Sequence, residues 1–153
     1  MKFICQGLVF NLAPEAIAQF EAVRQIRRNS PETGGQLFAH FSKSGVEIVS
    51  ATLTKGNSTR GRFWFRPDRA TERMDIEMQF SEGFHYVGDW HTHAETYPQP
   101  SAADVSSMVD IYTNSQHELQ GLLLVIVGRS RLPRGLFVGF VNDEGVSRCD
   151  LAE

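Results

Sequence analysis

Hydrophobic and polar positions along this chain repeat with two periods, one typical of strands and one typical of helices. Apolar or alternating runs predict strands at residues 2–10, 36–41, 46–53, 62–66, 84–90, 121–127 and 134–141. Apolar residues three or four positions apart predict helices at residues 13–28, 68–82 and 101–114. Because strands and helices alternate, with hairpins among them, the pattern predicts an α/β (α+β) fold with a mixed β-sheet packed between helices.

The first predicted helix carries the most complete set of local signals. Its apolar face is predicted to consist of Ile17, Phe20, Val23 and Ile26. Pro14 lies in the first turn, where its missing N–H costs nothing. Arg27 and Arg28 are expected to close the helix, because cations interact favourably with a helix C-terminus. Further along, residues 42–45 are predicted to turn a hairpin, and residues 55–61 form a polar loop.

Length and composition indicate one compact domain spanning residues 1–153. The chain is 41% hydrophobic and 22% charged, which are values of globular proteins. Its formal net charge of −3 argues against nucleic acid as an obligatory partner. No apolar run is long enough for a membrane span, and the N-terminal segment is interpreted as a strand and not as a signal peptide. We therefore expect a cytoplasmic protein, in which Cys5 and Cys149 are reduced structural thiols.

Candidate chemistry is concentrated between residues 88 and 108. His91 and His93 are one residue apart, and strand geometry would place both imidazoles on one face. Asp104 follows at the start of a predicted helix and would add a carboxylate. Two histidines and an aspartate fit a catalytic zinc site with an open fourth position, where water is activated.

Each half of this motif also has an ordinary interpretation. Ser101 and Asp104 form the pattern of a capping box, which needs no metal. A histidine pair on a strand is more often a surface or packing feature than a ligand pair. The combination at a fixed spacing favours the metal site.

Metal-assisted amide hydrolysis also requires a group that moves protons. Glu32 precedes Gly34 and Gly35 just before a predicted strand. The two glycines would let backbone and substrate approach closely. A carboxylate there is a candidate general base and then acid. Glu95, within the loop between the ligands, is the next candidate; alternatively, Glu32 is a solvated residue of a turn.

The residues ETGGQLF and WHTHAETYPQPSAAD resemble the JAMM/MPN (JAB domain) zinc metallopeptidase family. The resemblance implies the MPN fold, which is similar to that of cytidine deaminases. It implies that His91, His93 and Asp104 bind Zn²⁺, and that Glu32 is the general base. It also implies that Ser101 stabilises the oxyanion. One departure is Ala94, where the family usually has proline after the second histidine.

Within this family, the chain is most similar to small bacterial deconjugating peptidases of cyclic-oligonucleotide antiphage systems. That similarity implies a zinc-dependent isopeptidase, related to the deubiquitinases, acting in antiphage defence. Its substrate would be a ubiquitin-like protein or a conjugated nucleotidyltransferase with a flexible C-terminal tail. An E1/E2-like conjugation enzyme would belong to the same pathway.

Other functions remain open at this point. A sulfur-carrier-processing JAMM peptidase and a non-catalytic MPN scaffold are the main alternatives. A zinc deaminase would need a Cys-x-x-Cys pair, which the sequence lacks. A RadC-like protein would be expected to have a more basic composition.

Five arginines fall between residues 60 and 73: Arg60, Arg62, Arg66, Arg69 and Arg73. The simpler interpretation is a solvated face, ion-paired with Asp68, Glu72 and Asp75. The functional interpretation is a docking surface for an acidic partner or a peptide carboxylate. The aromatic residues Phe63, Trp64 and Phe65 are expected to be core and edge residues.

Overall fold

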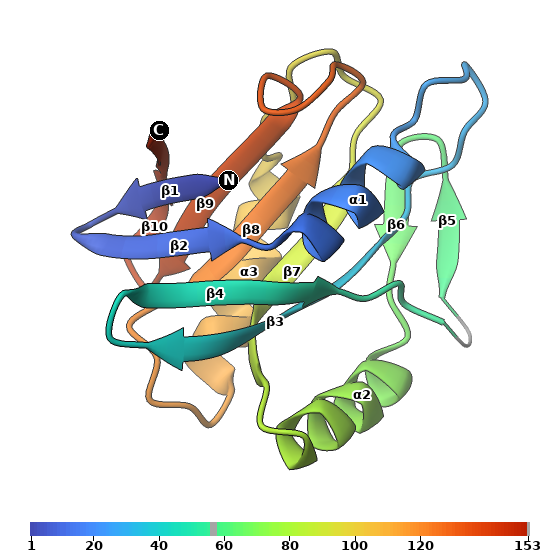
Figure 1. Cartoon of the computed structure of the whole chain (residues 1–153). Helices are drawn as coiled ribbons and strands as arrows, with labels where there is room; N and C mark the ends of the chain where they lie inside the picture. The colour runs from blue at the N-terminus through green and yellow to red at the C-terminus, as the bar shows by residue number, and fades with distance from the viewer. Residues whose placement is uncertain (56–57, 153) are drawn as a thin grey trace.

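A large mixed sheet organises the chain in a computed structural model that describes residues 1–55 and 58–152. Its strands are β1 (Lys2–Cys5), β2 (Leu8–Leu12), β3 (Gly34–Ser42), β4 (Gly45–Ala51), β7 (His85–Thr92), β8 (Leu122–Val127), β9 (Leu136–Asn142), β10 (Gly145–Arg148) and β11 (Asp150–Ala152). Their order is β10-β9-β8-β7-β3-β4-β2-β1-β11 (Figure 1). The pairs β2–β4 and β7–β8 are parallel, and the other neighbours are antiparallel.

Helices cover both faces of this sheet, as the sequence predicted. The helices are α1 (Pro14–Val23), α2 (Arg69–Ser81) and α3 (Ala102–Asn114). On one face, Phe20 of α1 packs against Trp90 with ring centroids 5.2 Å apart. On the other, Met108 of α3 belongs to a cluster with Leu124 and Ile126. Strand β8 is buried along its whole length because its alternate side chains enter different clusters.

The sheet curls until its two ends meet. Strands β10 and β11 lie at opposite ends of the strand order, yet only Cys149 separates them in the chain. The N–H of Cys149 donates to the carbonyl of Val138 at 2.8 Å. Cys5 and Cys149 are both buried free thiols, and burial together with a hydrogen bond that the Cys149 thiol donates to Cys5 raises the pKa of Cys149. These cysteines are therefore structural residues, as expected.

A second, two-stranded sheet stands apart from the main one (Figure 1). It consists of β5 (Thr59–Gly61) and β6 (Trp64–Arg66). The predicted strand at 62–66 is thus shorter, and the predicted polar loop at 55–61 contains a strand. Part of that loop, residues 56 and 57, lies outside the described residues. Phe63 and Trp64 are not core residues, since they are 70% and 49% exposed. Trp64 and Phe65 are edge residues, as expected, because they lie in β6 of this two-stranded sheet.

Two N-terminal predictions need correction. The predicted strand at 2–10 is a hairpin, because Gln6 and Gly7 adopt positive φ angles of 50° and 82° and reverse the chain. The predicted helix at 13–28 ends at Val23. Ile26 therefore does not join the apolar face and is 60% exposed.

Helix α1 ends early because the polar residues that follow Val23 make tertiary contacts. Arg24 donates to the carbonyl of Arg129 at 3.0 Å, and Gln25 donates to the carbonyl of Arg62 at 3.1 Å. These bonds take the backbone out of the helical path, and the prediction that Arg27 and Arg28 close the helix is wrong.

The other predicted elements are confirmed with small shifts of boundary. The second helix begins after Asp68, whose carboxylate accepts from the N–H groups of Ala70 and Thr71. Strands β10 and β11 were not predicted, because their sequences are short and mostly polar. None of the helices among the described residues is long and apolar enough to span a bilayer.

Candidate metal centre

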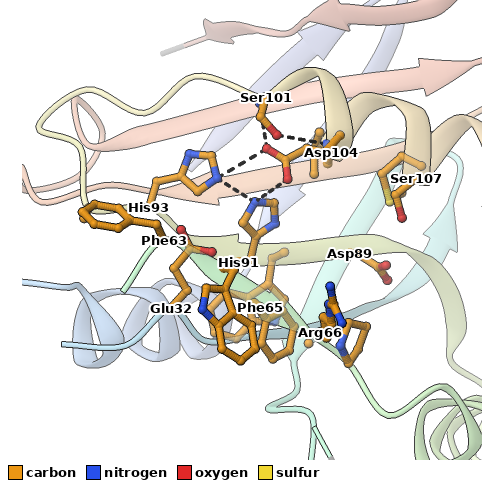
Figure 2. A pocket seen from close by; sticks show the side chains of 18 of the residues that line it. Glu32, Phe63, Phe65, Arg66, Asp89, His91, His93, Ser101, Asp104 and Ser107 are labelled. Carbon is orange, nitrogen blue, oxygen red and sulfur yellow. Dashed lines mark hydrogen bonds and ion pairs between the residues drawn. The ribbon is translucent and has the colours of Figure 1, made fainter. Parts of the chain in front are cut away.

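The two histidines reach the site from the middle of the sheet. His91 lies in β7, and His93 follows directly after that strand. Strand β7 is paired on both sides, with β3 and with β8, so its backbone is fixed. The N–H of His93 continues the ladder by donating to the carbonyl of Val127 at 2.9 Å. Period-two geometry then points both imidazoles to the same face, as Figure 2 shows.

The carboxylate comes from the start of α3. Ser101 is the N-cap, and its Oγ accepts from the N–H of Asp104 at 3.1 Å. Asp104 Oδ2 accepts from the N–H of Ser101 at 2.7 Å, which completes the predicted capping box. This short motif fixes the Asp104 side chain so that it faces the two imidazoles (Figure 2).

The ligand atoms converge at distances suited to one metal ion. The Nε2 atoms of His91 and His93 are 3.0 Å apart. They lie 3.2 and 3.4 Å from the two carboxylate oxygens of Asp104. With bonds of about 2.0–2.1 Å, neighbouring ligands of a tetrahedral zinc ion are about 3.3 Å apart. Two imidazole nitrogens and a carboxylate oxygen thus form a donor set that fits a divalent metal ion.

The electrostatics of these residues agree with a cation site. Burial alone would raise the pKa of Asp104, but hydrogen bonds from His91 and His93 hold it well below its usual range. Burial would lower the pKa of His93, but its hydrogen bond to Asp104 and the surrounding carboxylates raise it. Asp104 therefore stays ionised, and the cluster attracts positive charge.

Glu32 lies beside this cluster because of the register of two strands. Gly34 of β3 is paired with His91 of β7 in an antiparallel ladder. Continuing that register places Glu32 opposite His93, and Figure 2 shows its carboxylate directed toward the histidines. A Cβ on Gly34 would collide with the carbonyl of Trp90 and with Cβ of His91, so glycine permits the close approach.

The environment of Glu32 suits a group that exchanges protons. The side chain is buried, with 6% of the residue exposed. Burial raises the pKa of Glu32 to about 7, although the nearby His93 partly offsets this effect. A carboxyl group with a pKa near neutrality both accepts and donates protons readily.

Glu95, the other candidate base, takes a different position. Its Oε2 lies 3.7 Å from Nδ1 of His93, on the side of the ring away from Asp104. The same oxygen accepts from the N–H of Gln99 at 3.0 Å. Glu95 thus supports the loop between the ligands, in which Ala94 stands where the resembled family usually has proline.

The site opens into a pocket of about 580 Å³. One wall carries Phe63, Phe65 and Arg66 from the small sheet, and α3 supplies Ser107 and Met108 on another side (Figure 2). The pocket extends along β7 to Asp89, which lies on the same strand face as the two histidines.

A charged network lies at the far end of this pocket, and only its Arg69–Glu72 pair was expected from the sequence, in the ion-paired interpretation of the arginine cluster. Arg69 donates to Glu72 at 2.6 Å and to Asp89 at 3.3 Å. The hydroxyl of Tyr86 also donates to Asp89, at 2.8 Å. Asp89 could have been noticed because it precedes His91 by two residues, but its partner Arg69 on α2 could not be predicted from sequence.

A buried glutamine near Glu32 was also missed. Gln25 is 1% exposed and donates from Nε2 to the carbonyls of Ser30 and Arg62, at 2.7 and 3.1 Å. The N–H of Glu32 donates to the carbonyl of Gly61 at 2.6 Å. The segment carrying Glu32 is thereby attached to the small sheet.

Comparisons with known proteins agree with this geometry. A family profile described as prokaryotic homologs of the JAB domain matches residues 15–136. A CD-NTase/cGAS isopeptidase of Enterobacter hormaechei subsp. hoffmannii is 34% identical over 131 residues, covering 84% of this chain and 73% of the relative. A probable metalloprotease of Sinorhizobium fredii is 29% identical over 96 residues, covering 60% of this chain and 58% of the relative.

A solved structure supports the fold independently. The solution structure of a protein from Desulfitobacterium hafniense superimposes with a TM-score of 0.63. The match covers 91% of this chain and 88% of that protein at 16% sequence identity. At this identity the likeness concerns the fold alone.

Proposed function

Because the chain belongs to the family of prokaryotic homologues of the JAB domain, as the resemblance implied, we propose that it is a zinc-dependent isopeptidase. The observation that carries this proposal is the convergence of His91, His93 and Asp104 beside Glu32. Residues 1–153 are proposed to form one catalytic domain of this type. Its reaction is the hydrolysis of an amide bond between a protein C-terminus and an amine.

The metal is proposed to be zinc, held by His91, His93 and Asp104. Two histidines and one carboxylate are a ligand set that catalytic zinc uses, with a fourth position free. When bound, the ion supplies Lewis-acid chemistry, which polarises the scissile carbonyl and makes water more acidic.

Glu32 is proposed to be the general base and then the general acid. Burial raises the pKa of Glu32 to about 7 in the metal-free protein. A bound cation would favour its ionised form, so the carboxylate accepts a proton from the attacking water at neutral pH. The protonated group then donates that proton to the leaving amine. Only 6% of Glu32 is exposed, so its contact with bulk water is small.

Ser101 is proposed to stabilise the oxyanion of the tetrahedral intermediate. Its Oγ accepts from the N–H of Asp104, so the hydroxyl proton is available for donation into the pocket that Ser101 lines. A hydroxyl directed at developing negative charge contributes about 3 kcal/mol in comparable sites.

The substrate is proposed to be a protein with a flexible C-terminal tail. An extended tail in the pocket would place its last carbonyl at the metal centre and gain backbone hydrogen bonds along an exposed strand edge. Gly34 and Gly35 are proposed to flank its path. The isopeptidase relative is named for CD-NTase/cGAS, and a conjugated nucleotidyltransferase is accordingly the proposed substrate. A conjugated ubiquitin-like protein is the alternative substrate.

This substrate implies a pathway. A conjugate must first be made, so an E1/E2-like enzyme is the proposed partner. The proposed setting is antiphage defence in the cytoplasm.

The direct test uses an amide conjugate of such a tail, incubated with the enzyme with and without a chelator. Chelator-sensitive cleavage at the tail junction is expected. Intact conjugates together with processing of a sulfur-carrier protein would replace this proposal with the sulfur-carrier function. Failure to bind metal or to cleave either substrate would identify a scaffold.

A further inference from the structure

Three arginines of the β5–β6 hairpin lack an ion pair among the described residues. Arg60, Arg62 and Arg66 form no ion pair with any residue in 1–55 or 58–152. Arg69, by contrast, is fully engaged between Glu72 and Asp89. The ion-paired interpretation of the arginine cluster therefore holds for Arg69 and fails for the hairpin.

The charge of this hairpin is opposite to that of the chain as a whole. Residues 59–66 contain three arginines and no acidic residue, while the chain has a formal net charge of −3. Arg60 donates a hydrogen bond to Oγ1 of Thr33 at 3.3 Å, and this neutral partner leaves the charge of Arg60 in place. Guanidinium groups without an ion pair to any described residue produce a local positive potential that attracts anionic groups.

Exposed aromatic rings accompany these arginines. Phe63 and Trp64 are 70% and 49% exposed. The guanidinium of Arg62 lies over the Phe63 ring, 4.7 Å from its centroid. Arginine, tryptophan and phenylalanine are the residue types enriched in protein–protein interfaces. A surface that shows them together has the composition of a protein-binding site.

The hairpin is also continuous with the active site. Gly61 accepts from the N–H of Glu32, and Phe63 and Arg66 line the pocket. Figure 2 shows the Phe63 ring next to His93 and Glu32. A chain that fills the pocket therefore contacts the hairpin at Phe63 and Arg66.

We propose that this hairpin surface, made of Arg60, Arg62, Phe63, Trp64 and Arg66, docks an acidic segment of the substrate protein adjacent to the tail that is cleaved. The proposal rests on the proposed function and adds the chemistry of substrate selection. The arginines recognise carboxylates of the segment, and the two aromatic rings bury its apolar side chains. The short basic patch, on a chain of negative net charge, favours an acidic protein segment over nucleic acid.

Binding tests this surface without requiring hydrolysis. A fluorescein-labelled peptide of twelve residues, rich in glutamate and containing two leucines, is titrated against the intact protein by fluorescence anisotropy. Substituting Arg62→Glu should weaken binding about tenfold at low salt, since the charge reversal replaces attraction with repulsion. Lys43→Glu is the matched control, because this exposed turn residue makes the same charge change away from the hairpin. It should bind the peptide as the wild type does.

Two results would overturn the proposal. The first is equal binding by wild-type protein, Arg62→Glu and Lys43→Glu, or equal binding of a peptide with glutamine in place of glutamate. The second is preferential binding of a DNA duplex, which would make the hairpin a nucleic-acid site.

Kinetics separate this inference from the proposed function. With a conjugate that carries an acidic segment beside its tail, Arg62→Glu should raise KM about tenfold and leave kcat unchanged. With the isolated tail amide, both constants should stay at their wild-type values, because Arg62 does not line the pocket. If Arg62→Glu cleaves both substrates with an unchanged KM, the docking surface is refuted and the proposed isopeptidase function stands. If the wild-type protein binds the peptide but cleaves neither substrate, only the isopeptidase function is refuted.

Discussion

Thr33 and Thr92 join the segment carrying Glu32 to the strand carrying the histidines through two hydrogen bonds. The N–H of Thr33 donates to Oγ1 of Thr92 at 3.0 Å, and the N–H of Thr92 donates to the carbonyl of Thr33 at 2.8 Å. Thr92 stands between His91 and His93 in sequence, and Thr33 follows Glu32. The base and the ligands are thus positioned relative to one another by this pair.

Substituting Thr92→Val tests the role of this pair. Valine fills the same buried space but leaves the N–H of Thr33 without an acceptor, which should cost about 1–3 kcal/mol of unfolding free energy. The rate of hydrolysis should fall as well, because Glu32 loses its fixed position. Urea denaturation and kcat measure the two effects. Thr92→Ser keeps the hydroxyl and should restore most of both; equal behaviour of the valine and serine variants would show that the bond is unimportant.

Glu32→Gln should abolish most activity without removing the metal. Loss of a general acid–base typically lowers kcat by about 10²–10⁴-fold. In the wild type, kcat/KM should rise with pH as Glu32 ionises, since only the ionised carboxylate accepts a proton, and the midpoint should lie below the metal-free pKa of about 7 because a bound cation favours the carboxylate. The small remaining activity of the variant should lack this dependence. Metal analysis of the purified variant serves as the control, and near-normal turnover would direct attention to Glu95 as the base.

The same substitution should stabilise the metal-free protein above neutral pH. The pKa of Glu32 is raised from 4.5 to about 7 in the folded state. The folded protein therefore binds this proton more tightly than the unfolded chain, and its contribution to stability is complete below about 4.5 and disappears as the pH rises through 7. At pH 8 the chelator-treated Glu32→Gln variant should be about 1–3 kcal/mol more stable than the wild type.

At pH 4.5 the two proteins should unfold alike. Thermal unfolding at both pH values provides the measurement. A variant that is no more stable than the wild type at pH 8 would show that burial does not penalise the Glu32 carboxylate.

Metal content gives the most direct test of the ligand residues. The wild-type protein should contain one zinc ion per chain, and His91→Ala/His93→Ala should contain none, because Asp104 alone supplies too few ligands. Elemental analysis after purification without added metal measures this. His117→Ala is a suitable control, since His117 contacts Tyr112 away from the cluster. Stoichiometric zinc in the double variant would place the metal elsewhere.

Much of the fold was predictable because its strongest signals are local. The buried strand 122–127 is a continuous apolar run, and the capping box at Ser101 and Asp104 needs only four consecutive residues. The approximate position of β7 followed from its apolar sequence, and the spacing of its histidines then gave the candidate ligands. These features depend on short-range chemistry that the sequence displays directly.

The features that were missed depend on contacts between distant segments. The helix α1 ends at Val23 because Arg24 and Gln25 bond to Arg129 and Arg62, far away in the chain. Arg69, which pairs with Asp89 of β7, likewise comes from another element, α2. Hydrophobic periodicity contains no information about such polar tertiary contacts.

Because the β5–β6 hairpin is separate from the main sheet, the two parts of the site differ in the free-energy cost of local opening. The histidines belong to a strand whose neighbours are paired on both sides, so exposing its amides requires breaking the core. A two-stranded ribbon is only marginally stable and opens at much lower free-energy cost. Hydrogen exchange should therefore be fast at residues 59–66 and slow along β7. The wall that meets the substrate can rearrange while the metal ligands keep their places.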